Sequence, residues 1–147
     1  MKHLDYNEET LKKVSDLIMK NLTLDLLPKG WMMRNFSNPT FGHCHTASGC
    51  LYKIFGPEQV KLYRGLDDED IWHWWIVDKN DNIIDLTQDQ YLSTGRIPPH
   101  DKGEKAGLLG FGYKKNVIML LDRVARQYGP ELKHMQKEHS LENFFEE

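Results

Sequence analysis

The stretch IWHWWIV, residues 71–77, is apolar on both of its alternating faces and predicts a β-strand that is covered on both sides. His73 is the one ionisable residue within it. Four turn-forming residues, KNDN at 79–82, and a second strand-like run at 83–87 follow directly. We therefore predict an antiparallel hairpin that holds His73 in an apolar setting.

A second stretch, FGHCHTAS at residues 41–48, places Cys44 between two histidines just after a glycine. Apolar residues then recur at helical spacing until Gly56-Pro57, so Cys44 is predicted to open a helix. Cys50, on the apolar stripe of that helix, is the only other cysteine. A disulfide between the two would need distorted geometry, which favours a reducing compartment and at least one free thiol.

Cys44 and His73 together suggest nucleophilic chemistry. A thiol attacks as its thiolate, which a helix N-terminus and a nearby imidazole both stabilise. A third group usually fixes the tautomer of such a histidine, and Asp85 is the candidate across the hairpin. If Val77 pairs with Ile83, Asp85 shares a face with His73; a tighter turn would put it on the opposite face.

Three further residues are predicted to serve a substrate at this site. The backbone N–H of Cys44 and the side-chain amide of Asn38 are candidate donors to an oxyanion. His43 lies beside the nucleophile, and Trp75 is predicted to line a substrate pocket.

Structural interpretations of the same residues stay open. Cys44 could be a small buried residue at a helix start, His73 a hydrogen-bonded core histidine, and Asp85 a cap or a partner of Thr87. A zinc site also has candidate ligands, which are His43, Cys44, His45, Cys50 and His73. No established ligand spacing is present, so we expect no metal and no cofactor.

The order of a cysteine opening a helix, a histidine on a strand and a polar residue on the next strand resembles papain-like, NlpC-type cysteine peptidases. The residues that carry a closer likeness are Trp31, PTFGHC at 39–44, HWW at 73–75, IDLT at 84–87 and Gln90-Tyr91. This pattern resembles the small YunG-like proteins of bacteria and their phages. The resemblance implies a papain-like α+β core, with Cys44 as nucleophile, His73 as base and Asp85 as orienting acid. That family often has Gly-Gln-Cys-Ala where this chain has Gly42-His43-Cys44-His45, which leaves the role of His43 open.

The remaining pattern predicts a single α+β domain over residues 1–147. A helix capped by Asn7 opens the chain, and a strand is predicted at 60–63 before an acidic, solvated loop. A short helix at 88–92, an irregular loop or lid at 93–112, and C-terminal helices at 113–128 and 131–145 complete the prediction.

Composition narrows the class of protein. The 147 residues carry a net charge of −3, so no general nucleic-acid binding is expected. The absence of an apolar signal core or a long apolar run predicts a cytoplasmic protein that does not enter membranes, in the host cytoplasm if a phage encodes it.

Two functions fit these predictions. One is a thiol hydrolase or acyl transferase that acts on an amide, isopeptide or thioester bond in a protein, a peptide or a small molecule. The alternative is a non-catalytic binding module on the same fold, such as a phage protein that blocks a host factor. The acidic loop at 67–70 and the loop at 93–112 motivate the alternative.

Overall fold

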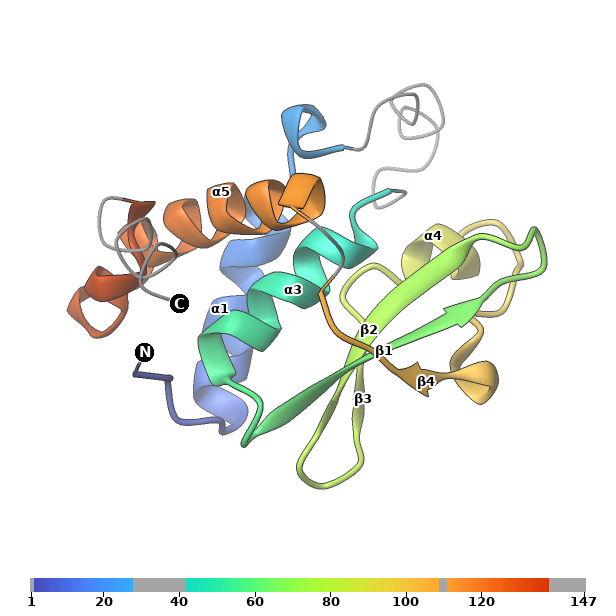
Figure 1. Ribbon diagram of the computed structural model, residues 1–147, viewed down its shortest axis with the longest axis horizontal. Coiled ribbons are helices and arrows are strands. Elements are labelled where there is room, and N and C mark those ends of the chain that lie inside the picture. The colour runs from blue at the N-terminus through green and yellow to red at the C-terminus, as the bar shows by residue number, and fades with distance from the viewer. Residues whose placement is uncertain (1, 28–41, 109–110, 138–147) are drawn as a thin grey trace.

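The computed structural model describes residues 2–27, 42–108 and 111–137, and Figure 1 shows their arrangement. The chain forms a mixed α+β fold with a small antiparallel sheet, as the sequence predicts. Its elements follow one another in this order: α1 (Glu8–Lys20), the 3-10 helix η1 (Leu24–Leu26), α3 (Cys44–Phe55), β1 (Val60–Leu66), β2 (Trp72–Asp78), β3 (Ile83–Ile84), α4 (Asp89–Leu92), η2 (His100–Lys102), β4 (Glu104–Lys105), α5 (Phe111–Tyr128) and η3 (Pro130–Met135).

The sheet has the strand order β3-β2-β1-β4, and all of its pairs are antiparallel. Val77 pairs with Ile83, which confirms the register that puts Asp85 on the same face as His73. The third strand is shorter than predicted, because the ladder ends at Ile84. The chain then leaves the sheet, and Asp85 accepts a hydrogen bond from the N–H of Thr87 instead of continuing the strand.

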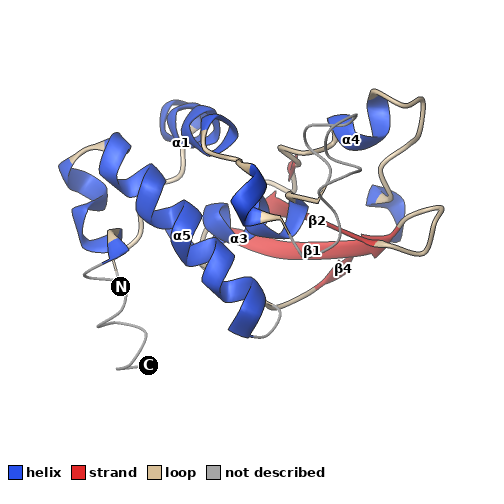
Figure 2. Ribbon diagram, turned by 90° about the horizontal axis from the view of Figure 1, so that it is seen from above, coloured by secondary structure: helices blue, strands red, loops and turns tan. Residues whose placement is uncertain are grey.

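Helix α3 lies between the sheet and the other long helices. It packs against β2 and β1 on one side and against α5 and α1 on the other, and Figure 2 shows α1, α3 and α5 beside the strands. The core is formed by fully buried apolar side chains from these elements, among them Ile18, Ile54, Leu62, Ile76 and Leu120. Burial of this apolar surface fixes α3 against the sheet.

Helix α1 begins where the sequence predicts. The side chain of Asn7 accepts a hydrogen bond from the N–H of Thr10 at 2.9 Å, and the Thr10 hydroxyl accepts one from the N–H of Asn7 at 3.1 Å. This reciprocal pair forms a capping box and satisfies two donors at the helix start.

Several predicted boundaries need correction. Strand β1 runs to Leu66, beyond the predicted residue 63, because all seven of its residues pair with β2. The loop predicted at 93–112 is not wholly irregular: it contains η2 and the edge strand β4, and α5 already begins at Phe111.

The last predicted helix, at 131–145, is a 3-10 helix over Pro130–Met135, and residues 138–147 lie outside the described part. None of the helices within the described ranges combines the length and the apolar character needed to cross a bilayer.

Candidate active site

Cys44 is the first residue of α3 and is 5% exposed. Gly42, with a φ of 87°, adopts the left-handed conformation that glycine accepts readily, and the chain turns there into the helix. The free N–H groups and the partial positive charge of a helix N-terminus favour a thiolate at this position. Cys44 and Cys50 are both free thiols, and burial raises the pKa of Cys50 far above its ordinary value.

His73 lies on β2 with no exposed surface, and its Nε2 is 2.6 Å from Oδ2 of Asp85. Two opposing influences act on the charge of this imidazole. Burial, the largest, lowers its pKa, whereas hydrogen bonds with Asp85 and Cys44 and the charges of both groups raise it. The pKa of His73 rises to about 9, so the imidazole is cationic at neutral pH.

The other nitrogen of His73 is also occupied. The Gln90 side-chain Nε2 lies 2.9 Å from His73 Nδ1 and 3.4 Å from the Thr87 hydroxyl. A neutral ring with its proton on Nε2 accepts from this amide at Nδ1, whereas an imidazolium needs the amide oxygen there. Rotation of the Gln90 amide would serve both charge states of the ring.

Asp85 is buried, with only 1% of its side chain exposed, and it receives three donors. Oδ2 accepts from His73 Nε2 and from His100 Nε2, the latter at 2.7 Å, while Oδ1 accepts from the N–H of Thr87 at 3.2 Å. Burial acts most strongly and raises the pKa of Asp85, but the hydrogen bonds from His100 and His73 outweigh it. The pKa of Asp85 is therefore below its ordinary value, and the group is a carboxylate.

His100 belongs to the 3-10 helix η2, which packs over the face of the sheet that carries Trp75. The His100 ring makes an edge contact with Trp75, with centroids 4.9 Å apart. A Cβ on Gly103 would lie 2.5 Å from Cζ2 of Trp75, and one on Gly65 would lie 2.8 Å from the carbonyl oxygen of Pro99. The backbone of this segment thus approaches the sheet as closely as glycine permits.

A second network joins Tyr91 of α4 and Arg96, which follows α4, to the acidic turn between β1 and β2. The Tyr91 hydroxyl donates to Oδ2 of Asp67 at 2.8 Å, and the Tyr91 ring lies edge-on to His73 at 4.7 Å. Arg96 forms ion pairs with Asp67 at 3.4 Å, with Asp68, and with Glu69 at 3.3 Å. The expectation that this acidic loop is solvated is therefore wrong for Asp67, which is buried because Tyr91 and Arg96 bind it.

His43 and His45, which flank Cys44, are not among the described side chains that could share a metal ion with His73. Both are buried, and burial lowers the pKa of each to about 4, so both rings are neutral. His45 packs edge-on against Trp74 with centroids 4.7 Å apart. His43 precedes α3 at the N-cap position, and its Nδ1 has no hydrogen-bond partner among the described residues.

The remaining predicted site residues are placed as follows. Trp75 is 1% exposed and contacts the segment around His100, so solvent does not reach it in this arrangement. Asn38 lies outside the described residues. Of the predicted set, His73 and Asp85 are hydrogen-bonded to each other, and Cys44 is near enough to His73 to raise the pKa of its ring.

One group of side chains could present ligand atoms to a metal ion: those of His73, Asp85 and His100 all lie within 4.8 Å of one another. The separations of 2.6 and 2.7 Å between the nitrogens and Asp85 Oδ2 are hydrogen-bond distances. We therefore treat the group as a hydrogen-bonded chain.

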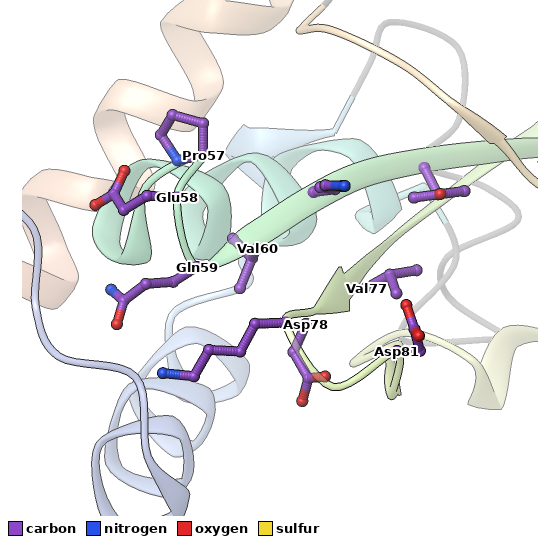
Figure 3. A pocket seen from close by; sticks show the side chains of 10 residues that line it. Pro57, Glu58, Gln59, Val60, Val77, Asp78 and Asp81 are labelled. Carbon is purple, nitrogen blue, oxygen red and sulfur yellow. The ribbon is translucent and has the colours of Figure 1, made fainter.

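Two pockets formed by described residues lie away from Cys44 and His73. A pocket of about 270 Å³ is lined by residues that include Pro57, Gln59, Val77 and Asp78, and Figure 3 shows it. It lies at the end of β2 that is opposite to His73, and its lining includes no histidine or cysteine. Cys44 and His73 are buried, and neither lines this pocket.

Comparison with models of protein families, with curated proteins and with solved structures finds no match for this chain. The geometry of its own residues therefore carries the functional argument.

Sequence patterns alone indicate no role for His100 or Gln90. Gln90 falls within the quoted pattern, three residues after Thr87, and that signal could have placed it near His73. His100 follows Pro98-Pro99 in a predicted irregular loop, where no periodicity indicates its direction. Only the folding of that loop over Trp75 brings His100 to Asp85.

Proposed function

We propose that the protein is a thiol hydrolase or acyl transferase in which Cys44 attacks an acyl carbon. The observation that carries the proposal is the hydrogen bond of the buried His73 ring to Asp85, in a ring that Cys44 also influences. Its Nε2 is 2.6 Å from the carboxylate, and Cys44 contributes both a hydrogen bond and its charge to the raised pKa of the ring. A nucleophile, a base and a group that orients the base are the parts required for acyl transfer through a thioester.

The roles follow from the bonds that each group makes. Because Asp85 engages Nε2 of His73, the proton of the Cys44 thiol passes to Nδ1, and the Gln90 amide that bonds Nδ1 must then present its oxygen there or turn away. The resulting thiolate adds to the carbonyl carbon, and His73 returns the proton to the leaving group as the tetrahedral intermediate collapses to a thioester. Water then cleaves the thioester, or a second nucleophile accepts the acyl group.

The fold fits this role in its general arrangement. A helix that opens with the nucleophile, packed against an antiparallel sheet that carries the base, is the arrangement that a papain-like core would have. The likeness to YunG-like proteins predicts the same three residues, and we retain both as part of the proposal. A peptide, an isopeptide or a small amide or thioester is the corresponding class of substrate.

The alternative of a binding module rested on the acidic loop at 67–70 and on the loop at 93–112. Because Arg96 pairs with Asp67, Asp68 and Glu69 within the chain, these acids are already engaged. The structure therefore adds no observation in favour of that alternative.

An activated ester tests the proposal without knowledge of the natural substrate. Wild-type protein mixed with p-nitrophenyl acetate should release a burst of nitrophenol and carry an acetyl group on Cys44, detectable by mass spectrometry of peptides. Cys44→Ala should lose the burst, and Cys50→Ala should keep it, because Cys50 is fully buried. Equal nitrophenol release by wild type and Cys44→Ala would contradict the proposal.

A further inference from the structure

His100 shares with His73 a single buried oxygen atom. The two Nε2 atoms lie 2.7 and 2.6 Å from Oδ2 of Asp85, and the two rings are 6.3 Å apart between centroids. A carboxylate oxygen accepts two such donors at once, and hydrogen bonds to a charged acceptor are stronger than neutral ones. His100 therefore contributes one of the two side-chain donors that keep a charge on a group with 1% exposed surface.

We infer that His100 is a positioning residue: it holds Asp85 in its charged form and fixed in orientation toward His73, and so sustains the reactivity of Cys44. This inference rests on the proposed function. His100 acts through Asp85, since its ring reaches neither the sulfur nor any reacting atom in the contacts that the structure shows.

The same contacts make the reactivity of Cys44 depend on the docking of one segment. His100 lies on η2, whose neighbours Pro99 and Gly103 pack directly against Gly65 and Trp75 of the sheet. If the segment lifted away, Asp85 would lose a donor while remaining next to His73. Cys44 would then be active with the segment in place and weakly active without it.

Four elements bring titratable side chains to this chain of contacts: His73 from β2, Cys44 from α3, Tyr91 from α4 and His100 from η2. Asp67 and Arg96 lie behind the Tyr91 hydroxyl. Of these groups, only His73 and His100 bond the Asp85 side chain. A change at His100 therefore reaches Cys44 through Asp85 and His73.

Loss of the His100 donor leaves the Asp85 carboxylate less firmly held toward Nε2 of His73. The imidazolium of His73 is then less well supported, and the thiolate of Cys44 is less well paired. The acid limb of the pH profile of Cys44 reactivity should then move to higher pH.

The test measures alkylation of Cys44 by iodoacetamide from pH 5 to pH 9 by mass spectrometry. In that reaction the thiolate sulfur forms a bond to the methylene carbon and iodide leaves. His100→Phe keeps an aromatic ring against Trp75 but removes the donor. His100→Gln keeps an N–H donor without an imidazole, and it is the matched control.

We expect His100→Phe to react about 3- to 10-fold more slowly than wild type at pH 6, with the acid limb about 0.5 to 1 pH unit higher. His100→Gln should stay within about twofold of wild type, because it retains the donor. Thermal midpoints within a few degrees of each other would show that the segment remains folded in both variants.

Three outcomes would overturn the inference. If wild-type Cys44 reacts fast at pH 6 and His100→Phe has the same profile, the inference fails and the proposed function stands. If Gln and Phe lower the rate equally, His100 has only a structural role. If wild-type Cys44 reacts no faster than a small thiol, the proposed function fails together with the inference.

Discussion

Two buried carboxylates lie beside opposite ends of β2, and they differ in what binds them. Asp78 accepts from the Tyr6 hydroxyl at 2.7 Å and from the backbone N–H groups of Asn80 and Asn82. Asp85 accepts from two imidazoles and one backbone N–H. In both, burial is the largest influence and raises the pKa, yet the hydrogen bonds outweigh it and the pKa of each lies below its ordinary value.

A lowered carboxyl pKa therefore does not by itself identify a reactive site. The donors at Asp78 keep their protons near neutral pH, so that carboxylate closes a turn and holds the N-terminal segment. One donor at Asp85 is the imidazole of His73, which carries its charge at neutral pH and interacts with the Cys44 thiol. The chemistry of the partners separates the two sites.

The largest expected effect is on the rate of Cys44 alkylation, and it should separate the two carboxylates. Asp85→Ala should lower the rate of Cys44 alkylation at pH 6 about 10- to 100-fold, because the His73 imidazolium loses a charge-assisted hydrogen bond. Asp78→Ala should leave the rate within about twofold of wild type. The rates are measured with iodoacetamide on folded protein, and similar losses in both variants would remove the distinction between the two ends.

The second effect concerns the pH dependence of stability. The pKa of His73 in the fold, about 9, exceeds its ordinary value of 6.5, so protonated His73 stabilises the fold fully below pH 6.5 and this contribution is lost as pH rises through 9. The free energy of unfolding should fall by about 2 to 3 kcal/mol between pH 6.5 and pH 8.5. Urea unfolding at the two pH values measures this, and His73→Gln should show a much smaller change. An equal change in that variant would assign the pH dependence to other groups.

The third effect is structural. Asp78→Ala leaves the N–H groups of Asn80 and Asn82 and the Tyr6 hydroxyl without their acceptor, and should cost about 1 to 3 kcal/mol of stability. Tyr6→Phe removes only one of these bonds and should cost less. Urea midpoints rank the variants, and a larger loss in Tyr6→Phe would contradict the assignment of the turn to Asp78.

The smallest effect is at the start of α1. Asn7→Ala removes the capping box and should cost about 1 kcal/mol, without change in the reactivity of Cys44. Comparison with Thr10→Val separates the two halves of the box. A change in alkylation rate in either variant would show that α1 influences the site.

Local sequence signals were enough to predict most of the fold. The capped first helix, the helix opened by Cys44 and the hairpin around residues 79–82 each follow from periodicity and from turn residues nearby. The sequence left two registers of the hairpin open, and the observed pairing of Val77 with Ile83 selects the one that places Asp85 on the face of His73.

Non-local packing accounts for what the sequence did not predict. β4 forms only because residues 104–105 meet the free edge of β1, and η2 is held by close approach of Gly103 to Trp75. No spacing in the sequence indicates these contacts, so the hydrogen bond between His100 and Asp85 was not predicted. The burial of Asp67 has the same origin, since Tyr91 and Arg96 reach it from a separate part of the chain.

The most direct test of the account is the rate of Cys44 alkylation in the wild-type protein as a function of pH. An ordinary thiol gains reactivity with a midpoint near pH 8.5. If His73 stabilises a thiolate at Cys44, as we propose, the rate constant at pH 6 remains at least about one tenth of the rate constant at pH 9. A rate constant that falls tenfold per pH unit below pH 8, as for a small thiol, would contradict the pairing of Cys44 with His73.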